Sequence, residues 1–506
     1  MMAVRSIITG YPLSALLRGF MSATSFVDVN VTGIAIDSRK VLPGDLFIAC
    51  RMDQRSAITY INKAISAGAS AVVAEAGNLP ESLQCSVPVV WIDNLISKTG
   101  FIADRFYGHP SGEMTAIGVT GTNGKTSVSH ILAQTLSDSR KNLCGLIGTL
   151  GYGQIDNLVQ GLNTTPDPIT LHHLLANMRD QNITQVVMEV SSHGLDQYRI
   201  AGVDFDIAIF TNLSRDHLDY HGDMESYANA KRRFFTDYQI GKAVINLDDN
   251  FGRSLIEELS ENVQVIAYSL DADANLQLNK NILLVSGKIV SELPEKLTLE
   301  INTPWGAGCL TSNLMGKFNA HNLLACLSAL CLLDYPFDKA LFRLSHCKNI
   351  PGRMEKFGVD QQPQVVVDYA HTPDALEQVL LTLKTHCRGR LYCVFGCGGE
   401  RDKGKRSQMG AIAEQYADTI VLTNDNPRHE DPNAIIQDIL SGIRKRNQIV
   451  IETDREKAIT STIKAATEKD IVLIAGKGHE NYQNIGGERL SFSDQHVVGR
   501  VLESIR

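Results

Sequence analysis

The segment Gly118-Val-Thr-Gly-Thr-Asn-Gly-Lys125-Thr-Ser127 has the residue types of a loop that binds phosphate groups. Residues 115–120 predict a strand, residues 121–124 a tight loop, and the residues from Lys125 onward a helix. Backbone N–H groups in such a loop point at the phosphates, and the helix N-terminus adds positive potential. The lysine reaches the β- and γ-phosphates, and a hydroxyl after it ligates Mg²⁺. The segment predicts a nucleoside triphosphate site made by Gly121, Thr122, Asn123, Gly124, Lys125, Thr126 and Ser127.

The general phosphate-loop pattern is not fully met. It requires glycine where this chain has Val119, and the glycines stand at positions 118 and 121 instead. On this pattern alone, a glycine-rich turn before an ordinary helix remains an alternative.

Polar residues follow two further predicted strands. Glu189 ends the run Gln185–Met188, and His217 comes shortly after the run Ile207–Phe210. Because residues beyond the ends of parallel strands line one crevice, both side chains are expected near the phosphates and Mg²⁺. The alternatives are an ordinary acid at a loop end and a histidine with a structural hydrogen bond. Composition alone predicts that Lys231 lies on a solvated helix face.

Short apolar runs alternate with amphipathic stretches along the 506 residues. This alternation predicts an α/β fold with parallel sheets covered by helices. The length suggests about three domains. Turn-rich segments at 108–112 and 349–352 place them at 1–110, 111–348 and 349–506. The predicted strands are 71–74, 116–119, 185–188, 207–210, 243–246, 365–368, 391–395, 419–422 and 471–474.

Composition argues against several classes of protein. The net charge of −8, without a basic stripe, argues against a nucleic-acid binder. The apolar patch Leu13–Leu17 is interrupted by Arg18, so neither a signal peptide nor a membrane span is expected. Ten cysteines without a C-x-x-C pair predict reduced thiols in a cytoplasmic protein.

Motifs spread over nearly the whole chain resemble those of the Mur ligase family. In order, they are Asp37-Ser-Arg39, Pro43–Phe47, Gly118–Ser127, Asn163–Pro166, Glu189–His193, Asp216-His217, Tyr227–Lys231, Asn319–Asn322, Pro351–Glu355, Asp368–Pro373, Gly398–Arg406, Asp425–Arg428 and Ala475–Glu480. The resemblance implies three domains: a small α/β domain for the UDP end of a nucleotide sugar, a central phosphate-loop ATPase domain, and a Rossmann-like domain that closes over the site and holds an amino acid.

The resemblance also implies a reaction, the addition of the third residue of the peptidoglycan stem peptide. ATP activates UDP-N-acetylmuramoyl-L-alanyl-D-glutamate as an acyl phosphate, and an amine attacks it. The implied ATP contacts outside the loop are Asn322, Arg353, Asp368 and His371. The implied contacts to the nucleotide-sugar peptide are Ile36, Ser38, Asn163, Thr164, Thr165, Ser191, Gln197 and Arg199. A cytoplasmic monomer with only small-molecule partners is expected.

The segment Asp425-Asn-Pro-Arg428 resembles the form of the family that takes meso-2,6-diaminopimelate. Arg428 and Arg401 each suit a carboxylate, which planar guanidinium groups bind with paired donors. Glu480 and Asp425 suit an ammonium group. L-Lysine lacks the distal carboxylate, so a buried arginine would stay unpaired with it. Lys403 and Lys405 are interpreted as parts of a solvated basic turn. The remaining implied contacts are Asn426, Pro427 and Gly476.

Lys231 takes a new role through the resemblance, because the equivalent lysine in the family is carbamylated. The carbamate is an anion that suits a second Mg²⁺, and it forms only from a neutral amine. The implied metal ligands are Thr126, Glu189, His217 and Lys231 as carbamate, and the implied catalytic residues are Lys125, Lys231, His217 and Glu189.

One segment departs from the family pattern, and two other functions remain open. The turn at Arg51–Ala57 differs, which leaves substrate contacts from Asp53, Gln54 and Arg55 undecided. Another ligase of the superfamily, such as a folylpolyglutamate synthase, would share the loop but not the Asp425–Arg428 segment with Arg401. A non-catalytic nucleotide-binding protein would not need the two sets of metal ligands.

Overall fold

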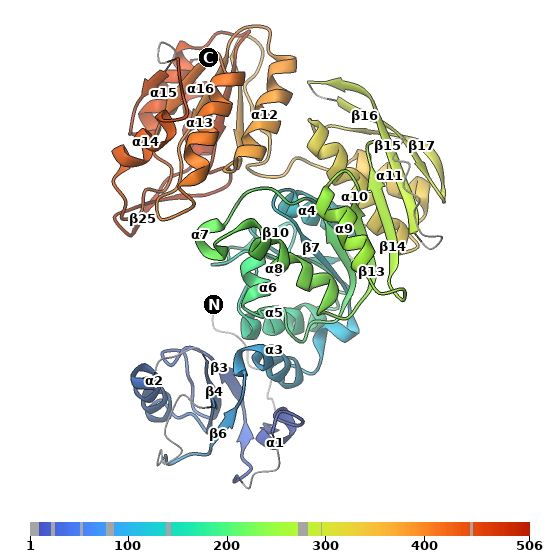
Figure 1. Ribbon diagram of the computed structural model, residues 1–506, viewed down its shortest axis with the longest axis vertical. Coiled ribbons are helices and arrows are strands. Elements are labelled where there is room, and N and C mark those ends of the chain that lie inside the picture. The colour runs from blue at the N-terminus through green and yellow to red at the C-terminus, as the bar shows by residue number, and fades with distance from the viewer. Residues whose placement is uncertain are drawn as a thin grey trace. The chain divides into compact units, whose positions relative to one another are not determined.

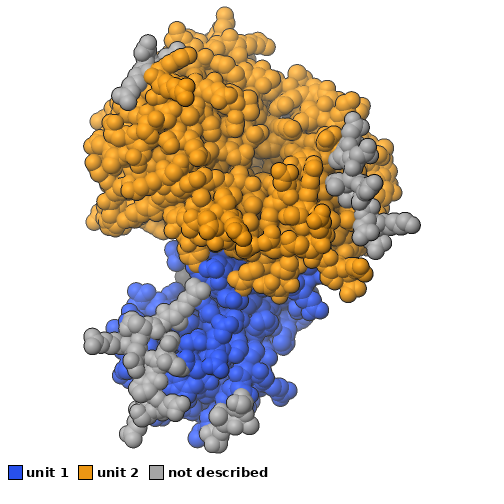
Figure 2. All heavy atoms as spheres, viewed as in Figure 1, with its two compact units in different colours: residues 1–118, 137–206, 238–240 blue, residues 119–136, 207–237, 241–506 orange. Residues whose placement is uncertain are grey.

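The computed structural model describes residues 10–21, 26–50, 54–76, 85–137, 143–271, 282–294, 296–445 and 449–505. These residues form two compact units, which are described separately (Figure 2). The first comprises 1–118, 137–206 and 238–240, and the second comprises 119–136, 207–237 and 241–506. No helix in the described ranges has both the length and the apolar character needed to cross a bilayer.

The first unit begins with a four-stranded parallel sheet in the order β3-β4-β5-β6. All five residues of β4 are buried, as expected for a strand covered on both faces. Leu46 and Ile48 pack in one apolar cluster with Ile102 of α3, and Phe47 packs in another with Ile61 of α2. The elements are β1 (Tyr11–Pro12), α1 (Leu13–Leu16), β2 (Asn30–Val31), β3 (Gly33–Ala35), β4 (Asp45–Ala49), α2 (Gln54–Ser66), β5 (Ala71–Glu75), β6 (Val89–Ile92) and α3 (Leu95–Phe106).

The rest of the first unit contains strands in the order β10-β9-β8-β11-β7, with residues 115–118 of β7 inside the unit. β8 and β11 are parallel, whereas β8, β9 and β10 form an antiparallel meander. The elements are η1 (Pro110–Glu113), β7 (Thr115–Thr120), β8 (Cys144–Gly148), β9 (Gly151–Gln154), β10 (Asn157–Val159), α5 (Pro168–Asp180), β11 (Gln185–Glu189) and α6 (Ser192–Asp196).

The second unit contains strands in the order β12-β13-β14-β15-β16-β17. β13, β14 and β15 are parallel, and β15, β16 and β17 form an antiparallel meander. The long helix α10 is almost wholly buried and packs on α4 and β14. The elements are α4 (Lys125–Leu136), β12 (Phe205–Phe210), α7 (Leu218–His221), α8 (Met224–Thr236), β13 (Ile240–Asn246), α9 (Asn250–Glu258), β14 (Gln264–Ser269), β15 (Ile282–Leu293), β16 (Lys296–Thr303), β17 (Gly306–Ser312), α10 (Lys317–Leu332) and α11 (Phe337–Ser345).

A six-stranded sheet in the order β18-β19-β23-β20-β21-β22 completes the second unit. It is parallel apart from β18, and apolar clusters cover both faces. Figure 1 shows its helices in orange and red. The elements are β18 (Glu355–Phe357), β19 (Gln364–Asp368), α12 (Pro373–His386), β20 (Leu391–Phe395), α13 (Gly404–Tyr416), β21 (Thr419–Leu422), α14 (Pro432–Leu440), β22 (Ile449–Ile451), α15 (Arg455–Ala465), β23 (Ile471–Ala475), β24 (Tyr482–Ile485), β25 (Glu488–Ser491) and α16 (Asp494–Ser504).

The predicted α/β class is confirmed, and each predicted strand lies within an observed one. The antiparallel meanders and the hairpin β24–β25 were not predicted. β10, β17 and β25 are partly or wholly exposed, so they lack the continuous apolar runs that mark buried parallel strands.

The buried carboxyl group of Asp104 in α3 predicts a pH-dependent stability. Its Oδ2 is hydrogen-bonded to His109 Nδ1 at 2.6 Å, and Oδ1 has no hydrogen-bond partner. Burial raises the pKa of Asp104 from 3.8 to about 6, against the opposing effect of His109. The folded state therefore favours the protonated acid, and stability falls as pH rises from about 4 to 6. Asp104→Asn is expected to raise the Tm by about 2 °C at pH 7.5 and to leave it unchanged at pH 4. Thermal melts of both proteins between pH 4 and pH 7.5 measure this difference. An equal dependence of Tm on pH in the wild type and in Asp104→Asn would contradict the prediction.

Candidate functional site

The loop between β7 and α4 is fixed by the end of β12. Thr122 N donates to Asn212 O at 2.8 Å, and Asn123 N donates to Asn212 Oδ1 at 3.0 Å. Thr211 Oγ1 donates to Asn123 O at 2.6 Å. Gly121 has a φ of +148°, and a Cβ there would lie 1.9 Å from Thr211 Oγ1, so this position tolerates only glycine. The loop is thus held in one conformation at the start of a helix, where its N–H groups suit an anion.

Two ammonium groups meet at the first carbonyl of this loop. Lys125 Nζ donates to Gly121 O and to Thr122 O, each at 2.8 Å. Lys231 Nζ also donates to Gly121 O at 2.8 Å and lies 4.5 Å from the centre of the Tyr227 ring. The composition-based expectation of a solvated Lys231 is wrong, because the residue is only 1% exposed. Burial, with the nearby charge of Lys125, lowers the pKa of Lys231 well below its ordinary value.

The buried carboxylate of Asp216 lies close to three basic groups, one of which is His217. Its Oδ2 lies 3.3 Å from His217 Nε2 and 3.5 Å from His371 Nε2, and its Oδ1 lies 3.5 Å from Lys405 Nζ. Burial opposes ionisation, but the His371 hydrogen bond and the Lys405 charge hold the pKa of Asp216 well below its usual range. The interpretation of Lys405 as solvated is therefore wrong, since its side chain is 7% exposed. Lys403 is 70% exposed, as that interpretation requires.

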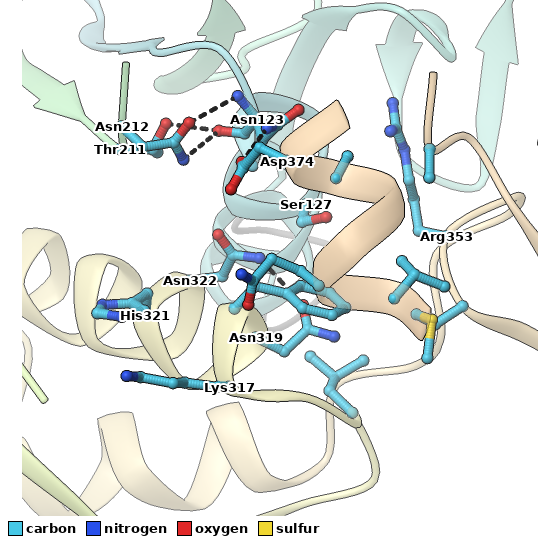
Figure 3. A pocket seen from close by; sticks show the side chains of 18 of the residues that line it. Asn123, Ser127, Thr211, Asn212, Lys317, Asn319, His321, Asn322, Arg353 and Asp374 are labelled. Carbon is cyan, nitrogen blue, oxygen red and sulfur yellow. Dashed lines mark hydrogen bonds between the residues drawn. The ribbon is translucent and has the colours of Figure 1, made fainter. Parts of the chain in front are cut away.

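A cavity of about 370 Å³ opens beside the loop (Figure 3). Asn123 lies at its edge and donates from Nδ2 to Asp374 Oδ2 at 2.8 Å. Asn322 donates from Nδ2 to Asn319 Oδ1 at 3.0 Å. The mixture of amide groups with apolar walls suits a base and a sugar. Predicted nucleotide residues on the lining are Asn123, Gly124, Ser127, Asn322, Arg353 and Asp368.

Arg353 links the loop helix to the segment before β18. Its Nη2 donates to Thr126 Oγ1 at 3.0 Å, and its guanidinium lies 4.5 Å from the centre of the Tyr369 ring. Asp368 accepts hydrogen bonds from Met354 N and Ala370 N, each at 2.7 Å, and burial raises its pKa. Arg353 and Asp368 therefore line the cavity. His371, the other predicted nucleotide residue in this region, contacts Asp216 instead and is not part of the lining.

Two loops of the six-stranded sheet bring together the predicted amino-acid contacts. Asn426 Nδ2 donates to Glu480 Oε2 at 2.8 Å. Lys477 Nζ donates to Glu480 Oε2 at 2.7 Å and to Asn426 Oδ1 at 3.0 Å, and Lys477 is fully buried. Gly476 has a φ of +111°, and a Cβ there would lie 2.6 Å from Asp425 Oδ2. The two loops are therefore closely packed and share a buried cation.

The two predicted arginines flank the same glycine turn. A Cβ at Gly398 would lie 3.1 Å from Arg428 Nη1 and 3.6 Å from Arg401 Cγ. Arg428 Nη1 donates to Gly399 O at 2.6 Å. Arg428, which follows Pro427, has a left-handed backbone with a φ of +54°. Arg401 is 46% exposed, with Nη1 3.5 Å from an oxygen of Asp219. The Arg428 guanidinium therefore lies at the turn, whereas that of Arg401 extends toward Asp219.

Glu189 belongs to the first unit, where it is 1% exposed. Its Oε1 accepts a hydrogen bond from Thr149 N at 2.8 Å, and its Oε2 accepts one from Thr149 Oγ1 at 3.1 Å. Thr164 Oγ1 lies 3.0 Å from Thr149 Oγ1, and Thr165 Oγ1 donates to Glu189 O at 2.8 Å. The carboxylate is thus held in a fixed orientation at the end of β11.

The other predicted substrate residues of the first unit form a connected group around Thr165. Ser191 N donates to Thr165 Oγ1 at 3.0 Å, and Arg199 Nη1 donates to Thr165 O at 2.7 Å. Arg199 Nη2 also donates to Gln197 Oε1 at 2.7 Å. Asn163 O accepts a hydrogen bond from the hydroxyl of Tyr152. These residues lie together although the chain places them up to 36 positions apart.

The predicted uracil-side residues lie after β3. Ser38 is 8% exposed, and Ile36 packs partly buried against the α3 side of the sheet. Between them, Asp37 accepts hydrogen bonds from Arg39 Nε and Nη2 at 2.9 and 2.8 Å. Asp53 lies outside the described residues, and the side chains of Gln54 and Arg55 are likewise outside them.

Protein side chains alone do not form a metal cage in the described ranges, where no group of three or more His, Cys, Asp or Glu residues is arranged to hold an ion. Mg²⁺ usually keeps several waters and takes one or two carboxylates with substrate phosphates. Of the four predicted metal ligands, Glu189 lies in the first unit, and Thr126, His217 and Lys231 lie in the second.

Sequence reasoning missed three charged residues near these sites, of which Asp216 and Lys477 are buried. Asp216 and Lys477 stand inside motifs that were recognised, but their own roles were not assigned. Asp374 follows the predicted ATP-side motif and pairs with Asn123. The signal available for each was a charged residue inside a motif flanked by buried strands, which alone does not distinguish an internal ion pair from a solvated side chain.

Comparisons with known proteins agree across the chain. Family models described as Mur ligase family, catalytic domain, as Mur ligase middle domain, and as Mur ligase, glutamate ligase domain, match residues 30–107, 119–330 and 352–478. The chain is 49% identical over 495 residues to UDP-N-acetylmuramoyl-L-alanyl-D-glutamate--2,6-diaminopimelate ligase of Coxiella burnetii (strain RSA 493 / Nine Mile phase I), covering 98% of this chain and 100% of that protein. A ligase with the same name from Pseudomonas aeruginosa is 46% identical, covering 94% of this chain and 96% of the relative.

Solved structures show the same fold. A structure of a UDP-N-acetylmuramoyl-L-alanyl-D-glutamate--2,6-diaminopimelate ligase matches with a TM-score of 0.68 and 34% identity, covering 98% of this chain and 99% of that one. MurF from Acinetobacter baumannii matches with a TM-score of 0.65 at 15% identity, covering 98% and 100%, which shows the fold alone. Several relatives are 44–49% identical over nearly the whole chain, and three family models match it. These matches show that this chain belongs to the Mur ligase family.

Proposed function

We propose that this protein ligates meso-2,6-diaminopimelate to UDP-N-acetylmuramoyl-L-alanyl-D-glutamate with ATP. The observation that carries the proposal is the cluster of charged side chains on the segment Asp425–Arg428, the loop Gly476–Glu480 and the Gly398 turn. It combines Arg428 and Arg401 with the buried carboxylate of Asp425 and the partly buried carboxylate of Glu480. An amino acid with two carboxylates and two ammonium groups complements such alternating charges. The similar ligases bear the name of this reaction.

The reaction has two steps. The γ-carboxylate of the D-glutamyl residue attacks the γ-phosphorus of ATP, giving an acyl phosphate and ADP. The amine of diaminopimelate then attacks the acyl carbon, the C–N bond forms, phosphate leaves, and the amine releases a proton. Lys125 holds the β- and γ-phosphates and neutralises the charge that moves toward ADP. Because hydroxide is a poor leaving group from a carboxylate, the activated phosphate supplies most of the driving force.

Thr126, Glu189, His217 and a carbamate on Lys231 are the residues that would hold Mg²⁺. The bound metal supplies positive charge to the phosphate oxygens and so stabilises the charge that develops during transfer. Asp216 orients His217 from the protein side, since its carboxylate lies 3.3 Å from Nε2.

A buried amine with a lowered pKa supports the proposed carbamate on Lys231. A neutral Nζ attacks the carbon of CO₂, an N–C bond forms, and one proton is lost to water. The product is an anion at the place where the amine now donates to Gly121 O. An anion there balances the charge of Lys125, which also reaches that carbonyl.

The remaining contacts are assigned by region. ATP would lie in the cavity beside the loop, against Asn322, Arg353 and Asp368, and His371 would act through Asp216. The group around Thr165 would hold the muramoyl peptide and its pyrophosphate, and Ile36 and Ser38 the uracil. The domains would span 1–110, 111–348 and 349–506. The proposed enzyme is a cytoplasmic monomer.

Substrate-dependent phosphate release tests the function. The purified protein is incubated with ATP, Mg²⁺ and UDP-N-acetylmuramoyl-L-alanyl-D-glutamate, and either meso-diaminopimelate or L-lysine is added. We expect phosphate release and a ligated product with diaminopimelate only. Release with lysine but not with diaminopimelate would overturn the amino-acid assignment, and release with neither would overturn the ligation itself. Release with a folate and glutamate instead would indicate another ligase of the superfamily.

A further inference from the structure

A fully buried ion pair lies beneath the two loops of the amino-acid pocket. Arg455 stands at the start of α15 and Asp494 at the start of α16, and both side chains are 0% exposed. Arg455 Nε donates to Asp494 Oδ1 and Arg455 Nη2 to Asp494 Oδ2, each at 2.8 Å. Burying two charges is costly unless further hydrogen bonds satisfy them. The remaining donors of the arginine therefore need partners.

Those partners are two backbone carbonyls, one before each loop. Arg455 Nη2 donates to Ala475 O at 3.0 Å, and Nη1 donates to Asn424 O at 3.3 Å. Ala475 directly precedes the loop Gly476–Glu480, and Asn424 directly precedes the segment Asp425–Arg428. One planar guanidinium thus joins the origins of both loops.

The sheet by itself does not set the spacing of these loops. They follow β23 and β21, which are not neighbours, because β20 lies between them. No ladder hydrogen bond connects two strands separated by a third. The two loops nevertheless pack closely, since a Cβ at Gly476 would lie only 2.6 Å from Asp425 Oδ2. Together with the direct hydrogen bonds that Asn426 makes with Glu480 and Lys477, the Arg455 bridge across the three strands holds the separation of the loops.

We propose that Arg455, oriented by Asp494, is a positioning residue that sets the width of the amino-acid pocket and hence its preference among amino acids; this rests on the proposed function. The guanidinium acts through the carbonyls of Asn424 and Ala475. The loops that begin after these carbonyls carry Asp425 and Glu480, the carboxylates assigned to the ammonium groups of the amino acid.

The test replaces the whole pair, because removing one partner would leave a buried charge and unfold the protein. Arg455→Met/Asp494→Leu keeps the volume and removes both charges. We expect kcat/KM for diaminopimelate to fall about 100-fold, as for a displacement of reacting groups by about 1 Å. KM for ATP and for the UDP-muramoyl dipeptide should stay within about twofold. Arg455→Lys, which retains the charge but not the planar fork, should lie between the wild type and the double variant.

Gln362→Met is the matched control. Gln362 is buried in the same sheet domain and donates from Nε2 to Leu502 O of α16 at 2.7 Å. Its Oε1 accepts a hydrogen bond from Val359 N at 3.2 Å, so neither partner belongs to the two loops. It should lower the Tm and leave every KM unchanged. A folded double variant with an unchanged KM for diaminopimelate, or one whose three KM values rise together, would overturn the proposal. A wild-type protein without ligase activity would instead overturn the proposed function.

Discussion

Replacing Lys231 with alanine is expected to lower kcat about 1000-fold, the order found when a charged group that stabilises phosphoryl transfer is removed. The side chain is buried, and its amine donates to the Gly121 carbonyl beside the charge of Lys125. This surrounding favours the neutral amine, which is the form that reacts with CO₂. Alanine cannot form the carbamate, so one proposed ligand of the Mg²⁺ that neutralises the phosphates would be missing. KM for the UDP-muramoyl dipeptide should change little, because the group is assigned to the transferring phosphate.

Chemical rescue separates this role from a structural one. Acetate or formate should restore part of the kcat of Lys231→Ala, because a small carboxylate occupies the space that the alanine leaves. Lys231→Arg should stay inactive with or without acetate, since arginine cannot form the carbamate and fills the space. Arg233→Ala, on the same helix with its side chain paired to Asp237 at the surface, is the control and should retain full activity. Full activity of Lys231→Ala without added carboxylate would refute the carbamate.

Replacing Arg428 with methionine is expected to raise KM for meso-diaminopimelate about 100-fold, which is the upper range for a hydrogen bond to a charged group. The guanidinium is held by the Gly399 carbonyl and flanks the Gly398 turn with Arg401. Methionine keeps most of the volume but offers no donor to a carboxylate. Because L-lysine has no distal carboxylate to lose a partner, its kcat/KM should not fall, and the ratio of kcat/KM values should fall by at least the same factor.

Steady-state kinetics with both amino acids measure this ratio. Arg489→Met is the matched control, because Arg489 lies on β25 in the same sheet domain, with its guanidinium 4.6 Å from the centre of the Tyr482 ring. It should leave both KM values unchanged. If Arg428→Met kept the KM of the wild type for diaminopimelate, the assignment of the distal carboxylate to this residue would be wrong.

Local patterns were enough to predict the class of fold and the phosphate loop. Continuous apolar runs mark strands buried on both faces, and their order with intervening helices indicates parallel sheets. Gly121 and Gly124 mark the tight turn, because only glycine accepts φ values of +148° and +88° without strain. These features depend on neighbours in the chain, so the residues themselves specify them.

The tertiary structure alone decided which charged residues are buried. Lys231 and Lys405 stand in helices whose composition suggests solvent, yet one lies against the phosphate loop and the other beside Asp216. His217 and Arg428 adopt left-handed backbone conformations, which cost free energy for residues other than glycine and are not marked in the sequence.

The strand, tight turn and helix around Lys125 could thus be predicted from local patterns, and the residues assigned to the amino acid could be predicted only by resemblance. The residues that hold that pocket together are far apart in the chain, as Arg455 and Asp494 show. Burial of a charge depends on a partner delivered by a different element of the fold, and no local pattern specifies where that partner arrives.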